Sequence, residues 1–155
     1  MLKYTTTQIV FSEIPEEVTL AVEISNCPIH CPSCHSKHLW NDVGAELDIN
    51  VLDRLATDYS GITCICFMGG DGDLESLLKL ASYLKDSFPN LNLAWYSGRE
   101  EVPLDKFVKF DYVKLGPYKE EFGPLNQETT NQRLYKREGN TWIDITYKFW
   151  NDCKI

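Results

Sequence analysis

Three of the six cysteines and all three histidines of this 155-residue chain fall between Asn26 and Trp40. The stretch reads NCPIHCPSCHSKHLW, and Cys27, Cys31 and Cys34 within it have the spacing C-x3-C-x2-C. Thiolates bind zinc and iron–sulfur clusters, and paired thiols carry out disulfide exchange. This stretch is therefore the first candidate in the sequence for a metal site, an iron–sulfur site or a redox site.

Shorter motifs within the stretch indicate other kinds of chemistry. Cys31 to Cys34 has the C-x-x-C spacing of a thiol–disulfide site, but that interpretation leaves Cys27 without a role. Cys31 to His35 looks like a haem attachment motif, which ordinarily requires export to an oxidising compartment. Structural zinc is the stronger alternative, because the three cysteines with His35 or His38 could complete a tetrahedron. Zinc ligands, however, usually come from two separated knuckles.

The number of cysteines also suits an iron–sulfur cluster. A 4Fe-4S cube that is held by three thiolates keeps one iron with an open position, where a small chelating ligand can bind. The absence of a fourth cysteine from the loop is then what the chemistry requires.

The segments around this loop alternate between strands and helices. The apolar patterns predict strands over 18–25, 62–70, 91–98 and 110–118, and helices over 49–59, behind a candidate Asp48 N-cap, and 74–84. This order is typical of an α/β domain with a mostly parallel sheet, in which functional groups gather at the C-terminal ends of the strands. Short polar or glycine-containing motifs stand at the C-terminal ends of these apolar runs, as the cysteine loop does after the first: Gly69-Gly70-Asp71, Ser97-Gly98 and Gly116-Pro117.

The charge balance restricts the class of partner. The chain has 23 acidic and 15 basic residues and a formal net charge of -8, which opposes wide contact with nucleic acid or with anionic lipid. The N-terminal stretch has no basic leader followed by an apolar region, and no segment approaches ~18 uninterrupted apolar residues. We therefore expect a cytoplasmic protein that binds neither nucleic acid nor membrane.

Two of these features together resemble the radical S-adenosylmethionine superfamily. Its members carry the C-x3-C-x2-C loop after an N-terminal strand and a glycine-glycine-acid-proline motif after the next strand. The second motif corresponds here to Met68-Gly69-Gly70-Asp71-Gly72, with Gly72 in place of the proline. Glycine at this point lets the main chain approach a ligand without an intervening Cβ.

Shorter strings narrow the resemblance to one family of glycyl-radical activases, the anaerobic ribonucleotide reductase activating proteins. The similar strings are CPSCHSKHLW, GGDGD, WYSG, FDYVKLGPY and TTNQRLY, within the span from Val18 to Tyr135. The sequence departs from that family in two places. The string IPEE replaces a glycine-rich segment before the first strand, and Leu115 stands before Gly116 where the family has an aspartate.

The resemblance implies a radical S-adenosylmethionine oxidoreductase. A 4Fe-4S cluster held by Cys27, Cys31 and Cys34 would cleave S-adenosylmethionine to a 5'-deoxyadenosyl radical. That radical would install a glycyl radical on the large catalytic subunit of anaerobic ribonucleoside-triphosphate reductase, with flavodoxin or ferredoxin as electron donor. The residues expected to contact S-adenosylmethionine are Ser33, Cys34, His35, Gly69, Gly70, Asp71, Ser97 and Gly98. No catalytic side chain is expected beyond the cluster ligands.

The resemblance also implies the fold, an incomplete β/α barrel of the radical S-adenosylmethionine type. Full barrels repeat more βα units than the roughly four seen here, so one side of the site should stay open to a macromolecular partner. Asn131, Gln132 and Arg133 are the residues expected at that partner contact. We expect residues 1–155 to form a single domain, with a C-terminal hairpin at 134–149.

The remaining cysteines have simpler interpretations. Cys64 and Cys66 alternate in the predicted strand over 62–70, and we expect them on opposite faces, buried as small apolar side chains and not joined in a metal site. Cys153 is expected to be a free thiol. Two other functions stay open, namely a radical enzyme that acts on another glycyl-radical enzyme or on a small molecule, and a non-enzymatic zinc-binding adaptor.

Overall fold

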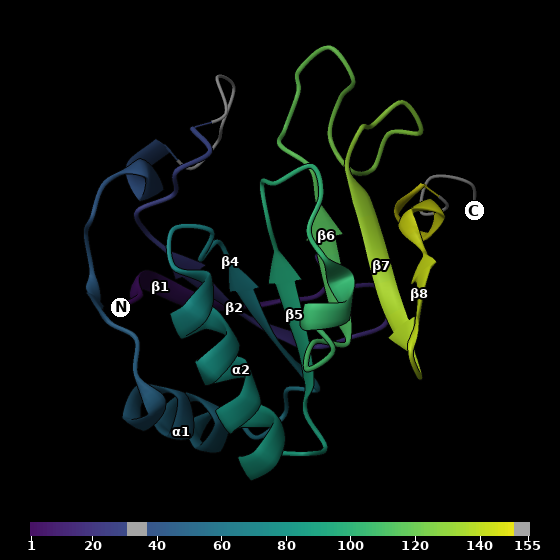
Figure 1. Ribbon diagram of the computed structural model, residues 1–155. Helices are drawn as coiled ribbons and strands as arrows, with labels where there is room; N and C mark the ends of the chain where they lie inside the picture. Colours follow the sequence, from purple (N-terminus) through teal and green to yellow (C-terminus); the bar gives the residue numbers. More distant parts are fainter. Residues whose placement is uncertain (31–36, 151–155) are drawn as a thin grey trace.

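The structure is a computed structural model that describes residues 1–30 and 37–150. These residues form one sheet with the strand order β3-β1-β2-β4-β5-β6-β7-β8, and two α-helices (Figure 1). The strands are β1 (Lys3–Val10), β2 (Thr19–Ile24), β3 (Ala45–Glu46), β4 (Cys64–Met68), β5 (Asn92–Tyr96), β6 (Tyr112–Leu115), β7 (Arg133–Glu138) and β8 (Thr141–Asp144). The helices are α1 (Ile49–Asp58) and α2 (Leu74–Ser87), with 3-10 turns η1 (Lys37–Trp40), η2 (Leu104–Lys106) and η3 (Thr146–Phe149).

The sheet is parallel only in its centre. Strands β2, β4, β5 and β6 run parallel, whereas β1 and β3 on one side and β7 and β8 on the other pair antiparallel. The predicted α/β class is confirmed, but the prediction of a mostly parallel sheet is wrong, because antiparallel strands are added at both edges. The described strands form a sheet with two ends, β3 and β8, and show no barrel.

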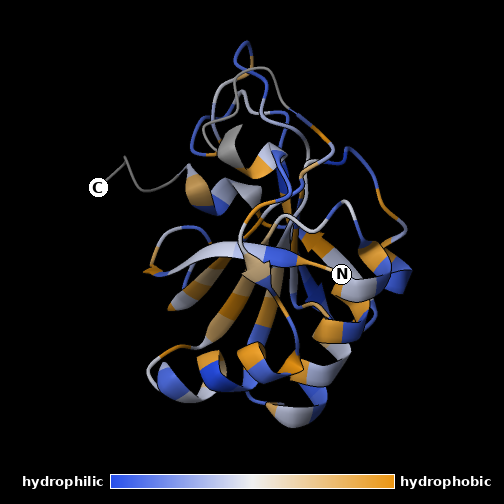
Figure 2. Ribbon diagram, turned by 90° about the vertical axis from the view of Figure 1, so that its left-hand side faces the viewer, coloured by the Kyte–Doolittle hydropathy of each residue, from blue (hydrophilic) through white to orange (hydrophobic). Residues whose placement is uncertain are grey.

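Both α-helices pack with their apolar sides on one face of the sheet (Figure 1). Asp48 is the N-cap of α1, since its carboxylate accepts a hydrogen bond of 2.9 Å from the N–H of Val51. Apolar ribbon alternates with polar ribbon along the helices (Figure 2). The core between helices and sheet contains Leu52, Leu55, Leu77, Leu80, Ala81 and Leu84 from the helices. In the described part of the chain, none of the helices has the length and apolar character that a membrane span needs.

The opposite face of the sheet has its own apolar cluster. Cys64 and Cys66 both belong to this cluster, together with Ile14 before β2 and Phe149 of η3. The prediction that the two cysteines lie on opposite faces is therefore wrong, because residues two apart in a strand share a face. Burial raises the pKa of both thiols, and both side chains are fully buried as predicted. They act as small apolar residues of the core.

The end of the chain adds a hairpin rather than another βα unit. Strands β7 and β8 pair antiparallel across Gly139 and Asn140, where the sequence pattern predicted a turn. The strands occupy less of the interval 134–149 than expected, because β8 ends at Asp144 and η3 follows it. This hairpin places the chain segment before β7 at the C-terminal end of β6.

Candidate functional site

A cavity of about 240 Å³ lies at the C-terminal ends of the parallel strands; we call it the strand-end cavity. Each of β2, β4, β5 and β6 contributes to its wall, either with its last residues or with the loop that follows. Residues of the lining that the sequence analysis selected are Cys27, Gly69, Asp71, Ser97, Gly98 and Gln132. The parallel strands thus bring together residues that are far apart in the chain, as the topology requires.

Cys27 stands at the start of the cysteine loop, just after β2. Its N–H donates a hydrogen bond of 2.8 Å to the carbonyl of Leu39, and the N–H of Asn26 donates one of 3.0 Å to the carbonyl of Asn41. The ring of His30 stacks on Trp40 with centroids 4.6 Å apart. Both ends of the loop are therefore joined at its base. The other predicted ligands and neighbours of the cluster, Cys31, Ser33, Cys34 and His35, lie outside the described residues, as does Cys153.

The glycine turn after β4 has the backbone conformation that its sequence predicts. Gly69 and Gly70 have φ angles of 116° and 95°, in the left-handed region that favours glycine. The N–H of Gly69 donates a hydrogen bond of 3.0 Å to the carbonyl of Tyr96, and its own carbonyl accepts one of 2.8 Å from the indole of Trp95. The main chain of Gly69 is therefore fixed by β5 at the wall of the strand-end cavity.

Asp71 lines the strand-end cavity, and its contact with S-adenosylmethionine stays a prediction. Its side chain is buried, and its carboxylate accepts hydrogen bonds from the hydroxyl of Ser97 (2.5 Å), the N–H of Gly98 (3.2 Å) and the guanidinium of Arg99 (3.2 Å). The carboxylate thus holds the loop after β5 against the loop after β4. The contacts of Asp71 are those of a positioning residue.

Gly98 brings the loop after β5 close to the cysteine loop. A Cβ at this position would lie only 2.9 Å from Cγ1 of Ile29, which is closer than carbon atoms normally approach. A side chain at residue 98 would force either Ile29 or the loop after β5 to shift. Glycine is therefore required here for close packing.

Lys114, which no sequence motif had indicated, lines the strand-end cavity from the end of β6. Its side chain is buried, and its ammonium group donates hydrogen bonds to the side-chain oxygen of Gln132 (2.9 Å) and to the carbonyl of Gly116 (3.1 Å). The ammonium also lies 5.1 Å from the centroid of the Tyr96 ring. One sequence signal could have identified it, because a lysine inside the apolar run YVKL is unusual in a buried strand.

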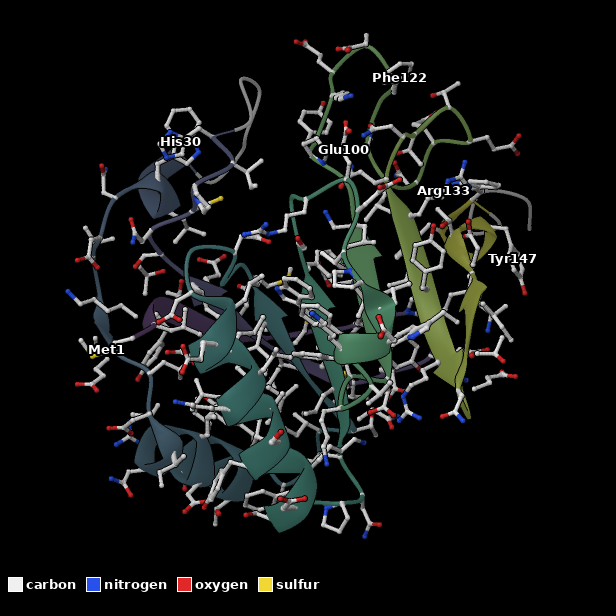
Figure 3. The ribbon with its side chains drawn as sticks, viewed as in Figure 1. Met1, His30, Glu100, Phe122, Arg133 and Tyr147 are labelled. Carbon is white, nitrogen blue, oxygen red and sulfur yellow. The ribbon has the colours of Figure 1, made fainter. Side chains whose placement is uncertain are left out.

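The three residues predicted to contact a partner have different placements. Gln132 is buried and holds Lys114 at the cavity. The amide of Asn131 donates to the carbonyl of Pro117 at 3.0 Å. Arg133 is partly exposed on β7, 3.7 Å from Asp144 (Figure 3). A partner contact for these residues stays a prediction.

The described residues alone do not make a complete metal site. Among residues 1–30 and 37–150, no three histidine, cysteine or acidic side chains lie close enough together to hold a metal ion. Cys27 contributes one thiol to the lining of the cavity, and the remaining predicted cluster ligands belong to the segment that is not described.

Comparison with known families assigns the class. Residues 17–116 match the family described as a 4Fe-4S single cluster domain, and this match spans more than half of the chain. The chain therefore belongs to the 4Fe-4S single cluster domain family, which is a family of radical S-adenosylmethionine activases. Searches of curated proteins and of solved structures gave no match.

Membership in this family implies a radical S-adenosylmethionine enzyme with a 4Fe-4S cluster. The matched segment includes the cysteine loop, the glycine turn and Lys114. The strand-end cavity fits these cofactors in the chemistry of its lining, which combines the thiol of Cys27, the main chain of Gly69 and the cation of Lys114. A thiol can bind iron, and a buried cation suits a carboxylate.

Proposed function

We propose that this protein is a glycyl-radical activase whose substrate is the large catalytic subunit of anaerobic ribonucleoside-triphosphate reductase. The observation that carries the proposal is the convergence of Cys27, Gly69 and Ser97 on one cavity at the ends of the parallel strands. Residues 17–116 also match a family of radical S-adenosylmethionine activases. The choice of reductase rests on the resemblance of the strings around these residues.

The proposed cofactor site uses three cysteines of one loop. Cys27, Cys31 and Cys34 would hold the 4Fe-4S cluster and leave one iron open to S-adenosylmethionine. When bound, the reduced cluster supplies the electron that cleaves S-adenosylmethionine to a 5'-deoxyadenosyl radical, and flavodoxin or ferredoxin would provide that electron. The loop keeps its ends together through the contact of Cys27 with Leu39.

The chain's other residues would bind and orient the nucleoside cofactor. Lys114 supplies a cation at the wall of the cavity, where it can pair with the carboxylate of the methionine moiety. The main chain of Gly69 lies at the same wall without a side chain in the way. Asp71 keeps Ser97 and Gly98 in position, and their loop forms the adjoining wall.

The first test is anaerobic reconstitution of the whole chain with iron and sulfide. The proposal predicts about four irons per chain, a brown protein and reductive cleavage of S-adenosylmethionine. Cys27→Ala should lose both the cluster and the cleavage, whereas Cys64→Ala, which changes a buried thiol outside the cavity, should keep both. A colourless protein that holds one zinc would contradict the proposal and favour an adaptor.

The second test concerns the substrate. Reduced protein and S-adenosylmethionine are mixed with the large reductase subunit, and the sample is examined by electron paramagnetic resonance. The doublet of a glycyl radical on that subunit supports the proposal. Cleavage of S-adenosylmethionine without this signal would favour another glycyl-radical enzyme or a small molecule as the substrate.

A further inference from the structure

Gln132, which the sequence places among the residues expected at a partner contact, lies in the wall of the strand-end cavity. The loop of residues 116–132 leaves β6 at the C-terminal ends of the parallel strands and returns to β7 at the same edge of the sheet (Figure 1). Gln132 is the last residue of this loop and is only 6% exposed. A buried amide in the wall of this cavity is a candidate for a contact with the cofactor.

The main chain of Gln132 is held in place from several directions. Its N–H donates a hydrogen bond of 3.1 Å to the hydroxyl of Thr130, which is itself buried. The neighbouring Asn131 donates to the carbonyl of Pro117 at 3.0 Å. Gly116 has a φ of 110°, and a Cβ there would lie 3.2 Å from Cα of Gln132, so glycine lets the two ends of the loop meet closely.

The side-chain amide of Gln132 has one orientation that suits its neighbour. An ammonium group only donates hydrogen bonds, so the amide oxygen must face Nζ of Lys114, 2.9 Å away. The amide nitrogen then lies on the other side of the group, and within the described ranges 1–30 and 37–150 it has no hydrogen-bond acceptor. This nitrogen is not among the buried polar atoms that are closed to solvent. Because Gln132 lines the strand-end cavity, its N–H donors are available to a ligand there.

Lys114 places a positive charge beside these donors. Its ammonium donates to the Gln132 oxygen and to the carbonyl of Gly116, and lies over the ring of Tyr96. The ring is uncharged, because burial raises the pKa of the Tyr96 hydroxyl, and that hydroxyl donates to the main-chain carbonyl of Glu13. These three groups orient the cation without neutralising it. A carboxylate is the ligand group that suits a cation flanked by N–H donors.

We propose that Gln132 is a second residue that binds the carboxylate of the cofactor, next to Lys114. The amide nitrogen would donate a hydrogen bond to this carboxylate, while the amide oxygen keeps the ammonium of Lys114 at the wall of the cavity. The identity of the cofactor as S-adenosylmethionine rests on the proposed function. The inference assigns Gln132 to the cofactor and not to the partner polypeptide.

The test compares two ligands on the cluster-loaded protein, with the cluster oxidised so that no cleavage takes place. S-adenosylmethionine and its decarboxylated analogue are each titrated by anaerobic calorimetry, and the ratio of the two Kd values measures the preference for the carboxylate. Gln132→Met keeps the length of the side chain but has no N–H donor, and it should reduce this preference about tenfold. Any contact of the carboxylate with iron is common to both proteins and leaves the comparison intact.

Two further variants complete the design. Gln127→Met changes an exposed glutamine of the same loop and should keep the preference of the wild type. The double variant Lys114→Met, Gln132→Met tests for direct contact, since its preference should fall several-fold below that of Lys114→Met alone. Equal preferences in these two variants would show that Gln132 acts only through Lys114, and would overturn the direct contact.

The outcomes separate this inference from the proposed function. An unchanged preference in Gln132→Met would overturn the inference and leave the proposed function intact. Because the ratio is taken within one protein, a general loss of stability lowers both affinities and does not imitate the expected result. If the preference depends on Gln132 while no glycyl radical forms on the reductase subunit, the proposed function fails and the binding role of Gln132 stands. A protein that binds neither ligand would contradict both.

Discussion

The hydroxyl of Ser97 donates a hydrogen bond of 2.5 Å to the carboxylate of Asp71, which joins the loop after β5 to the loop after β4. The same carboxylate accepts from Gly98 and Arg99, so one buried acid organises one wall of the strand-end cavity. The acid of the glycine-rich motif therefore shapes this cavity through its neighbours.

Replacing this acid should weaken both the fold and the site. Asp71→Ala removes a buried charge-assisted network, and we expect a loss of about 2–4 kcal/mol in the free energy of unfolding. The KM for S-adenosylmethionine should also rise, because Ser97 and Gly98 lose their anchor. Anaerobic denaturant unfolding and cofactor cleavage measure the two effects.

The matched control is Asp86→Ala, since the Asp86 side chain is 77% exposed and forms an ion pair of 4.0 Å with Lys109. This substitution should change the unfolding free energy by less than about 1 kcal/mol. Equal losses in the two variants would contradict the positioning role of Asp71.

Close packing at Gly98 gives a second prediction. Gly98→Ala places a methyl group 2.9 Å from Cγ1 of Ile29 and should cost about 1–3 kcal/mol through overpacking, together with a lower iron content after reconstitution. Gly61→Ala is the control, because no atom lies within 4 Å of a Cβ at that position. Shortening the opposing side chain in the double variant Gly98→Ala, Ile29→Ala should restore cluster loading. Failure of this rescue would mean that the clash is not the cause.

The buried cation at the end of β6 gives a third prediction. Lys114→Met keeps the volume of the side chain and should leave the Tm unchanged or raised, because burying a charge is costly. Loss of a charge-assisted contact of roughly 1.5–3 kcal/mol should raise the KM for S-adenosylmethionine by about tenfold or more. Lys79→Met, which changes a side chain that is 75% exposed, should affect neither quantity. An unchanged KM in Lys114→Met would remove this residue from the cofactor site.

Asp73 gives a prediction about pH. Hydrogen bonds from the amino group of Met1 and from the side chain and main chain of Ser76 lower the pKa of Asp73 to about 2. Because the pKa is lower in the folded state than its ordinary value of 3.8, the carboxylate stabilises the fold above that value and loses its effect as the pH falls towards 2. Asp73→Ala should therefore be about 1 kcal/mol less stable than the wild type at neutral pH, from loss of the α2 N-cap, and the difference should shrink below pH 4.

The measurement for Asp73 is the unfolding free energy of both proteins between neutral pH and pH 2. Asp73→Asn serves as the control, since it keeps an N-cap acceptor without the charge. A difference between wild type and Asp73→Ala that is constant over this range would contradict the pKa shift.

Much of the fold's centre could be predicted from local sequence patterns. The run ITCICFMGG is mostly apolar and ends in two glycines, which predicts the strand β4. The leucines of α2 recur at helical spacing, which predicts that helix. The first strand was missed because KYTTTQIV has mostly polar residues and a half-exposed burial pattern. Its antiparallel pairing with β2 depends on contacts between segments, which no local pattern encodes.

The convergence of the site residues could be predicted from the sequence wherever it depends only on the order of the strands. The ends of parallel strands meet at one edge, which is why Cys27, Gly69 and Ser97 converge. The parts that sequence reasoning missed depend on burial and on side-chain partners. Lys114 stands within the apolar run YVKL, but only the structure shows its side chain enclosed and hydrogen-bonded to Gln132.

The central claim is that this protein removes a hydrogen atom from a glycine of its partner, and isotope transfer tests it most directly. The large reductase subunit is prepared with deuterated glycine, incubated with the reduced protein and S-adenosylmethionine, and the 5'-deoxyadenosine product is analysed by mass spectrometry. We predict deuterium in the 5'-deoxyadenosine, in step with the glycyl radical signal, and neither in Cys27→Ala. Abundant 5'-deoxyadenosine without deuterium would contradict the claim.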